Sequence, residues 1–156
     1  MISDEEAEQV RADLAKLEAG DKTDKKYYAA AGRCRRALER YELQKNNPTI
    51  PMELHAVRIG DLAFATNRFE LFLDFGIRIK ARSPAKQTFI IQLTADNNGV
   101  GTYLPTERAI AGKGYGGGVY DNEVGPEGGQ MIVEETIKLL KELWPEAEKA
   151  RQDLGD

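Results

Sequence analysis

Apolar residues recur at helical spacing in the first quarter of the chain. In the first nineteen residues the stripe consists of Val10, Leu14 and Leu17. Ser3 and Glu6 form a capping box, in which each side chain satisfies a free backbone N–H at a helix start. A longer stripe follows within residues 23–45: Tyr27, Ala30, Ala31, Cys34, Leu38 and Tyr41. Pro48 cannot continue this helix, so the pattern predicts a helical hairpin over residues 1–47.

The pattern changes after Pro48. Polar and apolar residues alternate over 50–58, and Gly60-Asp61 forms a turn into an apolar run at 62–65, which predicts two paired strands. Residues 69–81 fit both a strand and a helix, because apolar residues alternate there and also line one helical face. Branched and aromatic residues predict a strand over 88–94, parallel to the preceding strand and joined to it by a right-handed βαβ crossover.

The last third of the chain combines a long loop with a final helix. Residues 97–129 contain ten of the fifteen glycines and are predicted to be loop, with a short helical turn at 106–111. Residues 130–144 form an amphipathic pattern whose inward face is expected to be Ile132, Val133, Ile137, Leu140 and Trp144. We therefore predict one α/β domain over residues 1–156, in which the hairpin is followed by an α/β core at 48–147.

Composition narrows the class of protein. The 156 residues are 41% hydrophobic and 31% charged, which is ordinary for a folded globular chain. A net charge of −4 argues against general nucleic-acid binding, which needs a basic surface. No stretch has the pattern of a signal peptide or a membrane span, so we expect a soluble chain of unknown location. The single cysteine, Cys34, is expected to be a small buried side chain.

Four segments carry a resemblance to a known family. They are Val57-Arg58-Ile59-Gly60-Asp61-Leu62-Ala63-Phe64-Ala65, Phe69-Glu70-Leu71-Phe72, Gly101-Thr102-Tyr103-Leu104-Pro105-Thr106 and Gly125-Pro126-Glu127. In this order they resemble the neutral (alkaline, non-lysosomal) ceramidase family, over about residues 52–143. The resemblance favours a helix after Glu70, because ceramidase-like sequences carry one there.

The resemblance implies a metal site. In that family two histidines, a glutamate and a tyrosine hold zinc, which activates a serine for attack on the ceramide amide. Glu70 and Tyr103 match the glutamate and the tyrosine, and Tyr115 with Gly114 and Gly116 would lie at the rim of the substrate cleft. The chain has one histidine and lacks the serine motif, so no residue is nominated as the nucleophile.

Because the second histidine and the serine motif are missing, the expected partner is the portion of the domain that would carry them. The chain resembles the C-terminal portion of a ceramidase-like catalytic domain, with part of a zinc site that an N-terminal portion would complete. It is expected to be inactive alone and to bind zinc weakly. Proteins of the family are often secreted or periplasmic.

Each of these residues also has a structural interpretation. Glu70 is equally suited to face solvent or to pair with a neighbouring arginine, because Arg68-Phe69 stands where the family has Pro-Gly. Tyr103 fits a loop aromatic that packs its ring and solvates its hydroxyl. His55 fits a half-buried strand histidine. A stand-alone hydrolase built from Glu70, Asp96 and His55 is a further alternative, but the spacing of these residues matches no catalytic pattern.

Two further patterns are interpreted as structural. Residues 112–117 match G-x-G-x-x-G without the strand and helix of a dinucleotide site. Four arginines in the second helix, Arg33, Arg35, Arg36 and Arg40, fit a solvated face paired with Glu39 and Glu42 better than a lipid-binding patch.

The alternative function belongs to a different class. The same fold would serve as a non-catalytic module that binds a partner or forms a homo-oligomer through its glycine-rich loop or its hairpin. A sheet edge or apolar face left uncovered would favour self-association.

Overall fold

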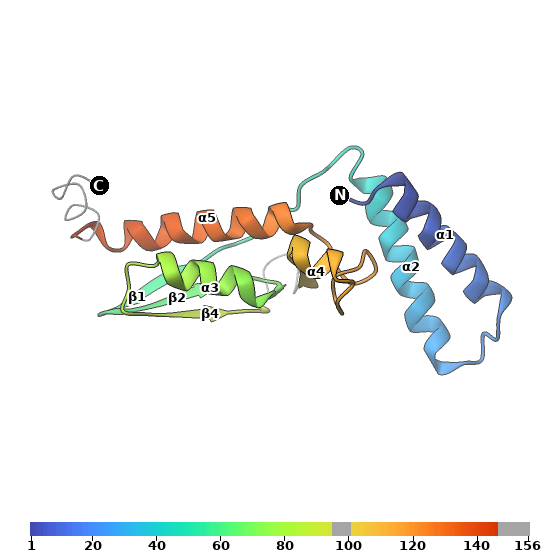
Figure 1. Cartoon of the computed structure of the whole chain (residues 1–156), viewed down its shortest axis with the longest axis horizontal. Coiled ribbons are helices and arrows are strands. Elements are labelled where there is room, and N and C mark those ends of the chain that lie inside the picture. The colour runs from blue at the N-terminus through green and yellow to red at the C-terminus, as the bar shows by residue number, and fades with distance from the viewer. Residues whose placement is uncertain (95–100, 147–156) are drawn as a thin grey trace.

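The computed structural model describes residues 1–94 and 101–146, and Figure 1 shows the arrangement of their elements. Two helices, α1 (Asp4–Ala19) and α2 (Lys25–Leu43), form the predicted hairpin. The capping box is present, with Ser3 Oγ accepting from the Glu6 N–H at 3.1 Å and Glu6 Oε2 accepting from the Ser3 N–H at 2.8 Å. Small side chains fill the space between the helices: Ala7, Val10, Ala31, Cys34 and Ala37.

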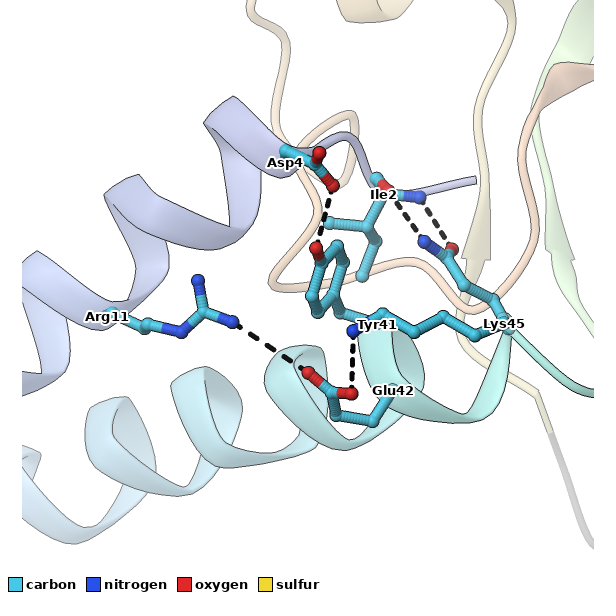
Figure 2. A network of polar contacts seen from close by, with 7 residues as sticks. Ile2, Asp4, Arg11, Tyr41, Glu42 and Lys45 are labelled. Carbon is cyan, nitrogen blue, oxygen red and sulfur yellow. Dashed lines mark hydrogen bonds and ion pairs between the residues drawn. The ribbon is translucent and has the colours of Figure 1, made fainter.

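Polar contacts hold the start of α1 against the end of α2, where the hairpin is open (Figure 2). The backbone of Ile2 exchanges two hydrogen bonds with the Gln44 amide, at 2.8 and 2.6 Å. The Tyr41 hydroxyl donates to Asp4 at 2.7 Å, and the Lys45 ammonium lies 4.3 Å from the centre of the Tyr41 ring. These contacts join the start of α1 to the end of α2.

A three-stranded mixed sheet follows the hairpin. It consists of β1 (Ala56–Ile59), β2 (Leu62–Thr66) and β4 (Gln87–Ile91), in the order β1-β2-β4. β1 and β2 are antiparallel across the predicted turn, where Gly60 adopts a φ of +59°. β2 and β4 are parallel and are connected through α3 (Leu73–Arg82), as predicted for a βαβ unit.

Helices cover one face of this sheet. α3 and α5 (Pro126–Glu142) lie on the same side of the strands in Figure 1. The core beneath them is built from large side chains: Phe69, Phe75, Ile79, Leu104, Ile132, Ile137, Leu140 and Trp144. All five inward-facing residues predicted for the final helical segment are buried. The opposite face of the sheet carries no helix in the part of the chain that the structure describes (Figure 1).

Three element boundaries differ from the sequence prediction. Residues 50–55 are not strand, although Met52 and Leu54 in this segment pack against the core. The fourth strand ends at Ile91, after which the chain turns and Leu93 adopts a φ of +56°. α5 begins at Pro126, whose fixed φ suits the first helical turn, although the following glycines resembled a loop.

The segment that fitted both a strand and a helix contains both. Glu70–Leu71 forms the short strand β3, and α3 begins two residues later. β3 pairs in parallel with β5 (Tyr103–Leu104), and α4 (Glu107–Ala111) follows with Thr106 as its N-cap.

Arg35 and Arg36 of α2 are exposed, as the sequence predicted, but Arg33 and Arg40 are partly buried. Arg33 pairs with Asp121 at 3.3 Å, and the half-buried Arg40 donates to the backbone oxygen of Val119. Tyr120, between these two partners, donates its hydroxyl to Asp13 on α1 at 2.7 Å. Arg33 and Arg40 therefore form long-range contacts, which join the hairpin to the loop before α5. Sequence spacing within α2 contains no information about this loop.

Candidate functional site

Glu70 and Tyr103 lie directly opposite each other on neighbouring strands. The register of the β3–β5 pair makes them Cα partners, and the Glu70 N–H donates to the carbonyl of Thr102 at 3.0 Å. The Phe72 N–H donates to Leu104 at 3.2 Å and closes the pairing on the other side. Both residues are partly buried. Two segments that are distant in the chain thus place a carboxylate beside a phenol.

Backbone bonds around the pair fix its position. Past β4, Thr94 donates to the carbonyl of Asn67 at 3.0 Å, and Gly101 donates to the carbonyl of Arg68 at 2.8 Å. Tyr103 in turn donates its N–H to Asp121 at 3.2 Å and forms a parallel bridge with Asn122. The Tyr103 backbone is therefore held between β3 and the loop before α5.

The residue preceding Glu70 has a structural role. Phe69 is almost completely buried, and a Cβ added at Gly101 would lie 2.4 Å from its ring. The Phe69 ring therefore packs closely against the backbone of the segment that leads to Tyr103. Arg68 is 4% exposed and its guanidinium lies 3.6 Å from the Glu123 carboxylate. Glu123, which the sequence did not suggest, is thus an acidic partner for Arg68.

The glycine-rich turn packs over the Tyr103 ring. Tyr115 is 78% exposed, and its ring meets the Tyr103 ring edge-on with centroids 5.4 Å apart. Gly116 has a φ of +74°, and a Cβ there would approach the Tyr103 ring to 2.6 Å. Gly114, also predicted at the cleft rim, donates its N–H to Ala109 and holds the turn against α4. All three predicted rim residues therefore lie in the turn that borders Tyr103.

The electrostatics of the pair follow from this geometry. Hydrogen bonding to the Glu70 carboxylate, with partial burial and the nearby Tyr115, raises the pKa of Tyr103 to about 12. At neutral pH the Tyr103 phenol keeps its proton and donates a hydrogen bond to the Glu70 carboxylate. The pair therefore presents two oxygen atoms of the kind that bind metals, with one hydrogen bond between them.

Two oxygen donors fit only part of a zinc coordination sphere. Zinc in proteins takes three or four protein ligands, with nitrogen or sulfur usually among them. Within residues 1–94 and 101–146, no group of three or more His, Cys, Asp or Glu side chains is placed to hold a metal ion. The donor chemistry of Glu70 and Tyr103 suits two positions of such a site, and the remaining positions need ligands from elsewhere.

His55 does not match its predicted environment. It is exposed instead of half-buried, because it precedes β1 at the edge of the sheet, and its imidazole lies 3.5 Å from the Glu53 carboxylate. Asp96, the third member of the stand-alone hydrolase alternative, lies outside the described residues.

A second polar feature was not predicted from the sequence. Ala30, Arg33, Cys34, Tyr120 and Asp121 line a depression of about 230 Å³ where α2 meets the loop before α5. Burial raises the pKa of the Cys34 thiol, so it remains protonated at neutral pH. The expected burial of Cys34 is confirmed, and this thiol is not an activated nucleophile.

Comparison of the chain with protein-family models, with curated proteins and with solved structures found no match. No helix among the described residues has the length and apolar character that crossing a membrane requires.

Proposed function

We propose that this chain is the C-terminal part of a neutral ceramidase-like, zinc-dependent N-acyl amide hydrolase. Glu70 and Tyr103 would supply two of the metal ligands, and an N-terminal ceramidase-like portion would supply two histidines and the nucleophilic serine. The supporting observation is the register of β3 with β5, which brings together the two residues that the family resemblance selects.

The residues of this chain would have distinct tasks in that site. Zinc, when bound, would act as a Lewis acid on the amide carbonyl and lower the pKa of the attacking group. Without a metal, the Glu70 carboxylate accepts a hydrogen bond from the Tyr103 hydroxyl. It would become available as a ligand once the phenol loses its proton. Gly116 allows the loop to pass over the Tyr103 ring, and the exposed Tyr115 borders the space where substrate would enter.

Zinc binding by the chain tests this proposal. We expect weak binding, with release of a proton and a rise in tyrosinate absorbance, because a metal on Tyr103 displaces the phenolic proton. Both signals should be lost in Glu70→Gln and Tyr103→Phe. The matched control is Tyr41→Phe, which removes a carboxylate-bound phenol from the hairpin and should leave both signals unchanged.

Three outcomes would contradict this assignment. Tight stoichiometric zinc binding by the chain alone would require a ligand set other than this pair. A tyrosinate signal that persists in Tyr103→Phe would place the metal at another phenol. Hydrolysis of N-acyl substrates by this chain alone would equally contradict the expected lack of activity.

One observation favours the alternative, a non-catalytic module that self-associates. α3 and α5 leave one face of the sheet uncovered (Figure 1). Strand register places Val57, Ile59 and Phe89 on that face, and each is more than 40% exposed. Such a surface is typical of an interaction site. The experiment for this second function is the oligomeric state in solution.

A further inference from the structure

The uncovered face of the β1-β2-β4 sheet is a continuous apolar surface. Strand register places the following residues on it, and we call them the outer face: Val57, Ile59, Leu62, Phe64, Phe89 and Ile91. Five of them are 39% to 61% exposed, and Phe64 is partly buried. Phe64 and Phe89 are register partners whose rings stack at 5.1 Å and 14°. The alternating residues Ala63, Ala65 and Thr88 are buried on the helix side.

The polar residues of this face carry no charge. The same register adds only Thr66 and Gln87 to it. Among the described residues, two ion pairs border the face: Asp61 with Lys86 at 2.6 Å, beside the β1–β2 turn, and Glu53 with His55 at 3.5 Å, where His55 is hydrogen-bonded to Thr66. A partner that relies on charge, such as an anionic lipid surface or a nucleic acid, finds no cationic cluster here, and the chain carries −4 overall.

The area of the outer face matches a homodimer. With these exposures its side chains present roughly 500 Å² of apolar surface, near the upper end for the largest patch on a monomer. A standard interface buries about 800 Å² on each partner, and about 65% of a homodimer interface is apolar, which again gives roughly 500 Å² per copy. One second copy would therefore cover the outer face almost completely.

A sheet face is also suited to pair with itself. Two sheets pack face to face at about 10 Å, with strands aligned to within about 30°. A two-fold axis brings the same patch from both copies together, so the uncharged centre of one meets the uncharged centre of the other. The stacked Phe64–Phe89 pair supplies the aromatic centre that such interfaces favour.

We propose that the outer face is the interface of a homodimer, in which the β1-β2-β4 sheets of two copies pack face to face. This inference rests on the second proposed function, self-association, and names its surface and its partner. It is independent of zinc binding at Glu70 and Tyr103, which lie on the separate β3–β5 pair.

Sedimentation equilibrium or light scattering over a concentration series tests the interface. We expect a monomer–dimer equilibrium for the unaltered chain, tightening as salt rises, because the contact is apolar and the chains repel each other weakly. Phe89→Glu should weaken the dimer by at least tenfold, and Ile59→Glu, nearer the sheet edge, provides a second variant of lower folding risk. Circular dichroism and thermal unfolding verify that each variant remains folded.

The matched controls are glutamate substitutions at exposed apolar residues of the helices. Leu73 is 76% exposed and Met131 is 65% exposed, and neither lies on the outer face. Leu73→Glu and Met131→Glu should leave the dissociation constant within about twofold of the unaltered chain.

Other results would overturn the proposal in distinguishable ways. A chain that remains monomeric at all concentrations would refute both the interface and self-association. A dimer that resists Phe89→Glu and Ile59→Glu but is lost with Leu73→Glu would retain self-association and refute this surface. Cosedimentation of a monomer with anionic vesicles, lost in Phe89→Glu, would assign the outer face to lipid.

Discussion

The helical hairpin and the α/β unit both bury apolar side chains, but the buried side chains differ in size. The hairpin core consists of small residues such as Ala7, Val10 and Ala37, and polar pairs such as Tyr41 with Asp4 fasten its open end. The α/β unit packs phenylalanine, leucine and tryptophan under one face of its sheet and leaves the other face uncovered. The hairpin therefore packs on itself and docks on the loop before α5 through Arg33 and Arg40, whereas the α/β unit retains an apolar sheet face and a phenol–carboxylate pair with capacity for further contacts.

Truncating a core residue in each region should give the largest difference between them. Phe69→Ala is expected to lower the free energy of unfolding by about 3 to 5 kcal/mol, because it removes a buried ring and leaves a cavity beside Gly101. Val10→Ala in the hairpin removes two carbon atoms and should cost about 1.5 kcal/mol. Urea unfolding of both variants measures the two values.

Equal costs would refute the comparison. If Phe69→Ala lost no more stability than Val10→Ala, the large-residue cluster would not be the more stabilising core. The segment that places Tyr103 would then not depend on Phe69 packing.

The hairpin was predictable because its signals are local. Ser3, Glu6 and the apolar stripes around Val10 and Cys34 are read within a few residues of one another, and the capping box and helices followed. The core side of the last helix was equally clear, since Ile132, Val133 and Leu140 repeat at helical spacing. Periodicity is the strongest signal that a single sequence provides.

The candidate site depended on contacts that no local pattern contains. Parallel pairing of Glu70 with Tyr103 joins distant segments, and only the family resemblance pointed to both residues. The docking of Arg33 and Arg40 onto residues 119–121 was missed for the same reason. The outer face was hidden too, because alternation in β2 and β4 shows two faces but does not show which one the helices cover.

Glycine substitutions in the two regions should differ in sign. A Cβ at Gly129 of α5 would lie 2.3 Å from the Phe75 ring, so Gly129→Ala should destabilise by about 1 to 3 kcal/mol through overpacking. The nearest atom to a Cβ at Gly32 of α2 is the Arg36 guanidinium at 3.5 Å, an ordinary contact. Gly32→Ala should therefore stabilise by about 0.5 to 1 kcal/mol, the usual gain inside a helix. Thermal and urea unfolding measure both changes, and a stabilising Gly129→Ala would show that α3 and α5 pack less closely.

Alkaline titration compares the phenol–carboxylate pairs of the two regions and should give the smallest effect. The pKa of Tyr103 is raised to about 12, first by its hydrogen bond to Glu70, whereas an unfolded tyrosine titrates near pH 10. The stabilisation from this hydrogen bond is fully present below about pH 10 and is lost as the pH rises towards 12. Glu70→Gln should lower the pKa of Tyr103 and move its tyrosinate absorbance to lower pH.

In the hairpin, Asp4 raises the pKa of Tyr41 in the same way, so Asp4→Asn should lower the pKa of Tyr41 without changing Tyr103. Tyr103→Phe and Tyr41→Phe assign each transition. If Glu70→Gln leaves the Tyr103 transition in place, the carboxylate does not hold the phenolic proton, and the two donors are not positioned to share a cation.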